Sequence, residues 1–277
     1  MSMHEDVRAY YDSSAEREWA RLSRPDDGAV EFAVTRRAIE DFVPPAARVL
    51  DIGGGPGRYS LWLAERGHQV TLADLSPTLI ALARDTVAAS PYGTRIDEIV
   101  VADACDLSRW TDGSFGAVLA LGPFYHLPNP EDRERAAGEL ARVLAPDGIA
   151  FVALMPRYAF LRRTLAIPDE RHHLSSPSFA ARVLDDGVFE NDIPGRFTGG
   201  YGARPEEIAP FFARHGFIGR ALLATESIVP DLQEELAALA VDNPEAHRAM
   251  LDTLVRMAGD PSILGMANHL LYVGQRA

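Results

Sequence analysis

The chain contains no lysine, a single cysteine and no long apolar run, and each absence excludes a class of function. All 27 basic residues are arginine. Without lysine the chain cannot form a Schiff base with pyridoxal phosphate or bind a nucleotide phosphate through a P-loop lysine. Cys105, the one cysteine, excludes an internal disulfide and any cysteine-based zinc spacing. We therefore expect Cys105 to be a small packing residue in a cytoplasmic protein.

Targeting signals and basic surface are also lacking. The first residues, MSMHEDVRAYYD, do not have the basic and apolar regions of a signal peptide, and no apolar run approaches the ~20 residues of a membrane helix. The formal net charge of −13 disfavours nucleic-acid binding, which depends on a basic surface. We expect a cytoplasmic protein whose partner is a small molecule, without nucleic acid or membrane. The sequence leaves open whether the protein forms a homo-oligomer.

The chain does contain a glycine-rich turn between a predicted strand and a predicted helix. Residues 48–52 form an apolar run typical of a buried parallel strand, and residues 59–66 have helical spacing. The intervening sequence GGGPG places four glycines within five positions. Because glycine permits positive φ and has no Cβ, a ligand can lie against this backbone and the helix N-terminus. The turn predicts a nucleotide-type cofactor site.

Three predicted strands are each followed or ended by an aspartate. Asp51 precedes the glycines, Asp74 follows the strand at 68–73, and Asp103 follows the strand at 98–102. Since the carboxyl ends of parallel strands meet at one edge of a sheet, we expect these carboxylates to lie close together. Asp51 would repel a pyrophosphate but can face an ammonium group, and Asp74 is placed to accept hydrogen bonds from ribose hydroxyls. The arrangement suits a cationic nucleoside that carries an amino acid.

A nicotinamide cofactor is the first alternative. Its fingerprint requires G-x-G-x-x-G, and Arg58 stands where the last glycine belongs. This mismatch disfavours NAD. A nicotinamide-dependent oxidoreductase and a noncatalytic cofactor-binding protein nevertheless stay open from these residues alone.

The order of predicted elements indicates a doubly wound α/β fold. Strands and helices alternate from residue 48 onward, with helices that begin after Ser76 and at Pro130. Helical segments at 7–22 and 29–42 precede the first strand. We divide the chain into a helical N-terminal lid (1–44), a cofactor-binding core (45–156), a substrate-cap insertion (157–203) and a segment that completes the core (204–277) with a helical insertion at about 230–260.

These motifs resemble those of a known family. VLDIGGGPGRYSLWLAERG, VTLADLS and VVADACDL are similar to the first three motifs of class I S-adenosylmethionine-dependent methyltransferases of the small-molecule type. The resemblance covers residues 49–155, and the segments 216–227 and 269–277 would form the family's closing hairpin. It implies a mostly parallel, seven-stranded Rossmann-like sheet, S-adenosyl-L-methionine as cofactor and S-adenosyl-L-homocysteine as product.

The resemblance also implies which residues bind the cofactor. The glycines would pack against it, Asp74 would bind its ribose, and Asp103 with Ala104 would flank its adenine. An N-terminal helix would close over its methionine end through Tyr11 and Arg21. The implied set is Tyr11, Arg21, Asp51, Gly53, Gly55, Gly57, Asp74, Leu75, Asp103, Ala104 and Leu121.

Catalytic candidates follow the fourth predicted strand. The segment 122–130 lies beside the transferred methyl in the resembled family, so Tyr125 and His126 could shape or deprotonate the acceptor, because histidine has a near-neutral pKa. Alternatively, these two side chains only pack under the cofactor. Glu170 is a further candidate base. The segment lacks the NPPY-like motif of enzymes that methylate amino groups of DNA or protein, which disfavours those acceptors.

The predicted cap is rich in arginine and histidine. Arginine side chains that converge there would bind carboxylate or phosphate groups, whereas arginines on a solvated surface would do no more than form ordinary pairs. Adjacent histidines in ERHHL do not readily share one helix face, so no metal site is predicted. The glycine-rich loop at 196–207 could fold over a ligand. The candidate substrate residues are Tyr125, Arg162, His172, His173, Arg196 and Tyr201.

Taken together, the residues and the resemblance predict an enzyme. It would transfer a methyl group from S-adenosylmethionine to a small, anionic metabolite, as in secondary metabolism, with O-methylation favoured. C- or N-methylation, including at a prenyl diphosphate, stays open because the fold determines the donor while loops and insertions select the acceptor.

Overall fold

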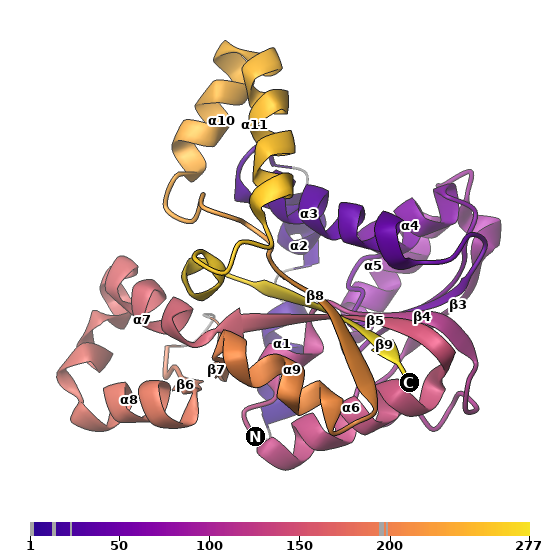
Figure 1. Ribbon diagram of the computed structural model, residues 1–277, viewed down its shortest axis with the longest axis horizontal. Coiled ribbons are helices and arrows are strands. Elements are labelled where there is room, and N and C mark those ends of the chain that lie inside the picture. The colour runs from indigo at the N-terminus through magenta and orange to yellow at the C-terminus, as the bar shows by residue number, and fades with distance from the viewer. Residues whose placement is uncertain (1–2, 13–14, 23, 194–196, 198) are drawn as a thin grey trace.

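A computed structural model describes residues 3–12, 15–22, 24–193, 197 and 199–277 of the chain. A central sheet is covered by helices on both faces. Figure 1 shows α3 (Asp27–Phe42) and α4 (Arg58–Glu65) on one face, and α6 (Pro130–Val143) and α9 (Pro205–Ala213) on the other. This layering is the doubly wound arrangement expected from the sequence.

Seven strands form the main sheet in the order β3-β2-β1-β4-β5-β9-β8. Strands β1 to β5 are parallel, and β9 runs antiparallel to both β5 and β8. The predicted mostly parallel, seven-stranded sheet is therefore confirmed. The strands are β1 Arg48–Ile52, β2 Gln69–Asp74, β3 Ile96–Val101, β4 Phe115–Ala120, β5 Leu144–Pro156, β8 Phe217–Ala224 and β9 Leu270–Arg276.

Two further strands arise inside the predicted cap and extend the sheet to nine strands. β7 (Gly199–Ala203) pairs in parallel with the carboxyl end of β5, and β6 (Val188–Glu190) pairs antiparallel with β7. The sequence did not indicate them, because both are short and three of the five β7 residues are glycine. Glycine has low strand propensity, so pairing with β5 decides this conformation.

The N-terminal segment differs from the prediction. Instead of one helix over residues 7–22, the chain forms α1 (Met3–Asp12) and α2 (Ala15–Arg21). α1 ends at Asp12, and aspartate side chains favour helix ends over helix interiors because they bond to nearby backbone groups.

Local signals set the starts of the core helices. α5 (Pro77–Ala88) begins after Ser76, whose hydroxyl accepts a hydrogen bond from the Leu79 amide at 3.0 Å. α6 begins at Pro130 after Asn129, whose side chain accepts a bond from the Glu131 amide. Both predicted starts are confirmed, because a capping side chain followed by proline satisfies the first-turn amides locally.

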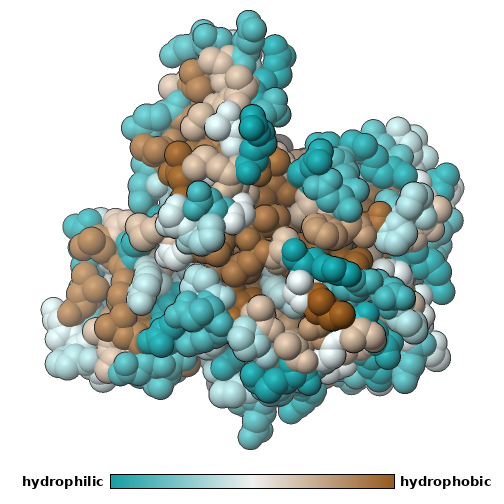
Figure 2. Space-filling model, in the orientation of Figure 1, coloured by the Kyte–Doolittle hydropathy of each residue, from teal (hydrophilic) through white to brown (hydrophobic). Residues whose placement is uncertain are grey.

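Two insertions project from the core (Figure 1). The first contains α7 (Arg157–Ala166), a 3₁₀ segment (Pro168–Ser175), α8 (Pro177–Ala181) and a π-helical turn (Arg182–Asp186). The second is the pair α10 (Gln233–Asp242) and α11 (Pro244–Met257). Figure 2 shows hydrophobic residues where this pair meets the body of the molecule, whereas its tip is hydrophilic. A hydrophobic cluster that includes Val30, Leu236 and Leu254 connects the pair to α3.

Two larger hydrophobic clusters pack within the core. One includes Phe124 and Tyr272, and the other includes Leu63 and Phe151; all four side chains are fully buried. Such packing fixes the strand ends that carry the site. Among the described residues, no helix combines the length and apolar character needed to cross a bilayer.

Candidate active site

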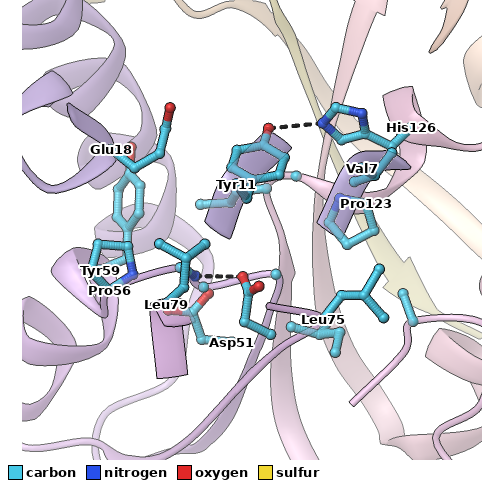
Figure 3. Close-up of a pocket in the computed structure, with 18 of the residues that line it drawn as sticks. Val7, Tyr11, Glu18, Asp51, Pro56, Tyr59, Leu75, Leu79, Pro123 and His126 are labelled. Atoms are coloured by element: carbon cyan, nitrogen blue, oxygen red, sulfur yellow. Dashed lines mark hydrogen bonds between the residues drawn. The ribbon is translucent and has the colours of Figure 1, made fainter. Parts of the chain in front are cut away.

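A deep pocket opens at the carboxyl ends of β1, β2 and β4, and we call it the main pocket (Figure 3). Its empty volume is about 1100 Å³, a figure that includes open solvent at its mouth. Every residue of the predicted cofactor set lines it except Gly57: Tyr11, Arg21, Asp51, Gly53, Gly55, Asp74, Leu75, Asp103, Ala104 and Leu121.

The glycine turn fits tightly beneath this pocket. Gly57 has a φ of 90° and caps the N-terminus of α4, so its role is to turn the chain rather than to line the pocket. A Cβ on Gly54 would lie 2.4 Å from Leu72 and 2.7 Å from the Asp51 carboxylate. Gly54, which the sequence analysis did not single out, is therefore the most constrained position of the turn.

Asp51 presents an acceptor atom without a donor. The side chain is 1% exposed, and the Ser60 hydroxyl donates to its Oδ2 at 2.7 Å. No group in the described ranges bonds to Oδ1. Burial raises the pKa of Asp51 to about 7. A buried carboxylate oxygen without a partner is unfavourable in a folded protein, so the pocket fits a ligand that brings a cationic donor.

Asp74 closes the turn and faces the same pocket. Its Oδ2 accepts a hydrogen bond from the Gly55 amide and its Oδ1 accepts one from the Ser76 amide, both at 2.8 Å. Burial raises its pKa to about 6. Since a carboxylate has about four lone-pair sites, Asp74 keeps acceptor capacity for the hydroxyl groups of a ligand.

Helices α1 and α2 lie over the main pocket. Tyr11 and His126 form a hydrogen bond of 2.8 Å across its roof (Figure 3). The guanidinium of Arg58 donates to the Trp19 carbonyl at 2.8 Å and stacks 4.5 Å from the Trp19 ring. These contacts support the proposal that the N-terminal segment acts as a lid.

A second cavity, the side pocket, adjoins the main pocket. The two share the lining residues Tyr11, Glu18, Arg21 and Tyr125. The largest share of the rest of the side pocket comes from α7, and the remainder comes from α1, β5, the loop before β7, the segment after β8 and the residues just before β9. These further lining residues are Tyr10, Met155, Ala159, Arg162, Arg163, Ala166, Ile167, Phe197, Asp231, Asn268 and His269. A donor in the main pocket and an acceptor in the side pocket would therefore meet at the shared residues.

Arg21 occupies the junction of the two pockets. Its guanidinium bonds both carboxylate oxygens of Glu31 and lies 3.3 Å from a carboxylate oxygen of Glu18. These carboxylates hold the pKa of Arg21 well above its usual range, although burial opposes the rise. Arg21 is thus a fixed positive charge that two acids balance.

An ion pair lies at one wall of the side pocket. His269 Nδ1 is 2.6 Å from Oε1 of Glu226, while Oε2 of Glu226 accepts hydrogen bonds from the amides of Asn268 and His269 at 3.2 and 2.9 Å. The sequence analysis missed this pair. The available signal was a glutamate near the end of one predicted hairpin segment, 216–227, and a histidine at the start of the other, 269–277.

Ligand-type atoms of Glu31, Glu226 and His269 lie within 4.8 Å of one another. They are already engaged, because Glu31 holds Arg21 and Glu226 holds His269. This mutual pairing favours an ion-pair network over a metal site.

The structure places the three catalytic candidates differently. Tyr125 lines both pockets, and His126 lines the main pocket. Burial lowers the pKa of His126 to about 3, so this histidine is neutral and weakly basic. Glu170 is 0% exposed, lines neither pocket and accepts hydrogen bonds from Arg163 at 2.6 Å and Asn191 at 3.1 Å. The prediction of Glu170 as a base is therefore corrected: it is a buried partner of Arg163.

Of the predicted substrate residues in the cap, Arg162 lines the side pocket. It donates to the Met266 carbonyl and to Asp231. Arg163 lines the same pocket. Arg196 lies outside the described residues.

The other predicted substrate residues are not at the pockets. His172 and His173 line neither of them, and both lie 3.3 Å from Asp192. Their rings are 4.0 Å apart, so adjacent histidines do converge here. Tyr201 lies in a different cavity, beneath the Arg133 guanidinium at 3.6 Å, because β7 directs it toward α6 and α9. These three predicted substrate residues therefore line neither of the two pockets described.

Comparison with known proteins agrees with this geometry. Residues 50–152 match a family described as a methyltransferase domain. The seven-stranded sheet, the glycine turn and this match identify the segment as a class I, S-adenosylmethionine-dependent methyltransferase domain, and they confirm the resemblance over this part of the chain.

Two curated relatives are similar over part of the chain. A ubiquinone biosynthesis O-methyltransferase from Xanthomonas axonopodis pv. citri is 37% identical over 165 residues, which are 55% of this chain and 66% of the relative. A demethylmenaquinone methyltransferase from Thermus thermophilus is 40% identical over 125 residues, 44% of this chain and 53% of the relative. The chain thus spans less than two thirds of either relative.

A solved structure matches over the whole chain. The 1,6-didemethyltoxoflavin-N1-methyltransferase of Burkholderia thailandensis, with bound 1,6-didemethyltoxoflavin and S-adenosylhomocysteine, covers 100% of this chain and 91% of its own, with a TM-score of 0.58. Its sequence identity is 18%. At that identity the likeness shows the fold alone.

Proposed function

We propose that the protein transfers a methyl group from S-adenosylmethionine to a hydroxyl group of a small aromatic compound. The observation that supports donor binding is Asp51 Oδ1, a buried acceptor atom beside the glycine turn to which none of the described residues donates a hydrogen bond. Its carboxylate suits the ammonium group of an amino-acid-bearing nucleoside, and the neighbouring Asp74 suits ribose hydroxyls.

The chain's contribution at the donor site is orientation. Asp51 and Asp74 would hold the two polar ends of the donor, and Leu75, Asp103 and Ala104 would border its adenine. The bound sulfonium supplies an electrophilic methyl group. The residues over the pocket, Tyr11 and Arg21, exclude water and hold the acceptor in line with that group.

The side pocket supports an aromatic, anionic acceptor. Tyr10 and Phe197 form an edge-to-face pair with ring centroids 6.4 Å apart, and Arg163 lies 5.6 Å from the Phe197 ring. These rings suit a planar compound, and Arg162 suits a carboxylate on it. The name of the Xanthomonas relative refers to O-methylation in ubiquinone biosynthesis, which favours a ring hydroxyl as the acceptor.

The proposal is tested by binding and by transfer. Calorimetry with S-adenosylhomocysteine should give a micromolar Kd, and NAD should not bind. Labelled S-adenosylmethionine should then methylate at least one member of a panel of hydroxybenzoates and dihydroxybenzoates, with label recovered as a methyl ether. NAD binding in place of S-adenosylhomocysteine, or no transfer to any member, would overturn it.

Asp74→Ala tests the donor site directly. The substitution removes a charged acceptor from the ribose position, so S-adenosylhomocysteine binding should weaken by more than ~1 kcal/mol. Asp106→Ala, at an exposed aspartate beyond β3, is the matched control and should leave binding unchanged. Equal affinities for Asp74→Ala and the unsubstituted chain would contradict the ribose role.

A further inference from the structure

Glu226 and His269 lie where β8 ends and β9 begins. The last residue of β8, Ala224, pairs with the first residue of β9, Leu270, and the amide of Thr225 then donates to the His269 carbonyl at 3.1 Å. This pairing brings together side chains that are 43 positions apart in the chain. Their contact is therefore built into the edge of the hairpin, next to the side pocket.

The environment of Glu226 keeps it ionised. It is 2% exposed and accepts two backbone amides on Oε2 and the imidazole on Oε1. Burial alone would raise its pKa, but His269 and these hydrogen bonds lower it. A carboxylate so fully buried is favourable only where charge and hydrogen bonds match it closely.

The pairing fixes which nitrogen of His269 is free. With Nδ1–H donated to Glu226, the lone pair of the neutral imidazole is on Nε2. No group in the described ranges bonds to Nε2, and His269 lines the side pocket. Its ring lies 5.5 Å from the ring of Tyr125, which borders both pockets. The free nitrogen is thus near the place where donor and acceptor meet.

His269 is a stronger base than an ordinary histidine. Burial alone would lower its pKa, but the charge of Glu226 and its hydrogen bond outweigh burial and raise the pKa. Glu31 adds to the rise, and Arg21 opposes it. His126 shows the contrast, because burial without such a carboxylate lowers its pKa. The titratable and charged groups around His269 are Arg21 and Glu18 on α2, Glu31 on α3, Tyr125 and His126 after β4, Arg162 on α7, and Glu226 after β8.

We propose that His269, oriented by Glu226, is the general base that deprotonates the acceptor hydroxyl. This inference rests on the proposed methyl transfer. The acceptor O–H bond breaks and its proton passes to Nε2 of His269. The acceptor oxygen forms a bond to the methyl carbon as the methyl–sulfur bond breaks, and that electron pair stays on sulfur. Glu226 then stabilises the imidazolium until it releases its proton to water.

Two substitutions and two controls test the inference. His269→Gln should lower kcat at least about a hundredfold, the usual contribution of a positioned base, with an unchanged Kd for S-adenosylhomocysteine. His215 and Glu134 form a pair of the same 2.6 Å length that lines neither the main nor the side pocket. His215→Gln and Glu134→Gln are therefore matched controls and should leave kcat unchanged. The probe acceptor is 3,4-dihydroxybenzoate, or whichever panel member the unsubstituted protein methylates.

Glu226→Gln supplies a readout that a purely structural role would not change. Because kcat/KM falls as His269 becomes protonated, its acid limb should lie above pH 6.5 in the unsubstituted protein. Loss of the carboxylate lowers the pKa of His269, so this limb should move to lower pH in Glu226→Gln. Glu134→Gln should not move it.

The outcomes separate this inference from the proposed function. The assignment of His269 as the base would be overturned if the activity of His269→Gln stays within about threefold of that of the unsubstituted protein. It would also be overturned if Glu226→Gln leaves the acid limb of kcat/KM at the same pH. Activity lost with EDTA and restored by Mg²⁺ would assign Glu31, Glu226 and His269 to a metal and also overturn it. If His269→Gln does not fold, the pH limb of Glu226→Gln decides. If the unsubstituted protein methylates no panel member, the proposed function is overturned, and the assignment of His269 as the base is overturned with it.

Discussion

The main pocket and the side pocket are built in different ways. In the main pocket, the glycine turn and the two carboxylates assigned to the donor, Asp51 and Asp74, all lie within residues 51–75, and residues of the N-terminal helices and of other strand ends complete the lining. The side pocket takes its groups from segments between Tyr10 and His269, including both ends of the chain. Donor binding is thus encoded in one local motif, whereas the acceptor site depends on how distant segments pack, which lets insertions change the acceptor without changing the donor.

Gly54→Ala should give the largest effect and tests the donor half of this comparison. The new Cβ would meet Leu72 at 2.4 Å and the Asp51 carboxylate at 2.7 Å. Overpacking of this kind costs about 1–3 kcal/mol, and here it would displace Asp51. We expect S-adenosylhomocysteine binding in calorimetry to weaken by more than about a hundredfold, which is about 3 kcal/mol.

Gly138→Ala is the control for that substitution. Nothing lies within 4 Å of a Cβ at Gly138, on α6. This variant should keep full binding and gain up to ~1 kcal/mol of stability, since alanine is the better helix former. Full binding by Gly54→Ala would show that the turn does not need its close packing.

Asp51→Asn should give an intermediate effect that depends on pH. The pKa of Asp51 is raised from 3.8 to about 7, so its contribution to folding stability is full below pH 4 and is lost as pH rises through 7. At pH 8 the ligand-free variant should therefore unfold at a higher urea concentration than the unsubstituted protein. Its free energy of unfolding should be larger by more than ~1 kcal/mol, because each unit of pKa shift is worth about 1.4 kcal/mol.

Ligand binding should change in the opposite direction in Asp51→Asn. Without the carboxylate, the Kd for S-adenosylhomocysteine at pH 8 should rise about tenfold through loss of a charged hydrogen bond. Urea titrations at pH 5 and pH 8, with and without ligand, measure both effects. Without ligand, the difference in free energy of unfolding between Asp51→Asn and the unsubstituted protein should depend on pH. The same difference at pH 5 and pH 8 would contradict the raised pKa of Asp51.

Arg162→Gln should give the smallest effect and tests the acceptor half. Arg162 lies in the side pocket and also bonds Asp231 at 3.2 Å, so its charge is partly balanced. The KM for 3,4-dihydroxybenzoate should rise about 5- to 10-fold, whereas the KM for uncharged catechol should not change. Arg171→Gln, at an exposed arginine bonded to the Leu165 carbonyl, is the control. An equal rise for both acceptors would remove the anion-binding role of Arg162.

Two predicted site residues lie away from both pockets for the same physical reason. Glu170 and Tyr201 were assigned to the substrate site because they lie in a polar or glycine-rich segment of the insertion. Their positions follow from contacts that no local pattern reports: Glu170 pairs with Arg163 and Asn191, and Tyr201 packs under Arg133. A polar segment predicts exposure and chemistry, but not the direction in which each side chain points.

The sequence alone determined the parts of this protein that depend on local physics. The strand, glycines and capping residues from Arg48 to Pro77 dictate a turn that leaves backbone amides and two carboxylates at one edge of the sheet, and so determine the donor site. Only the tertiary structure decided the side pocket and the Glu226–His269 pair. Their residues meet through strand pairing and packing across long chain separations, and hydrophobic periodicity carries no information about such contacts.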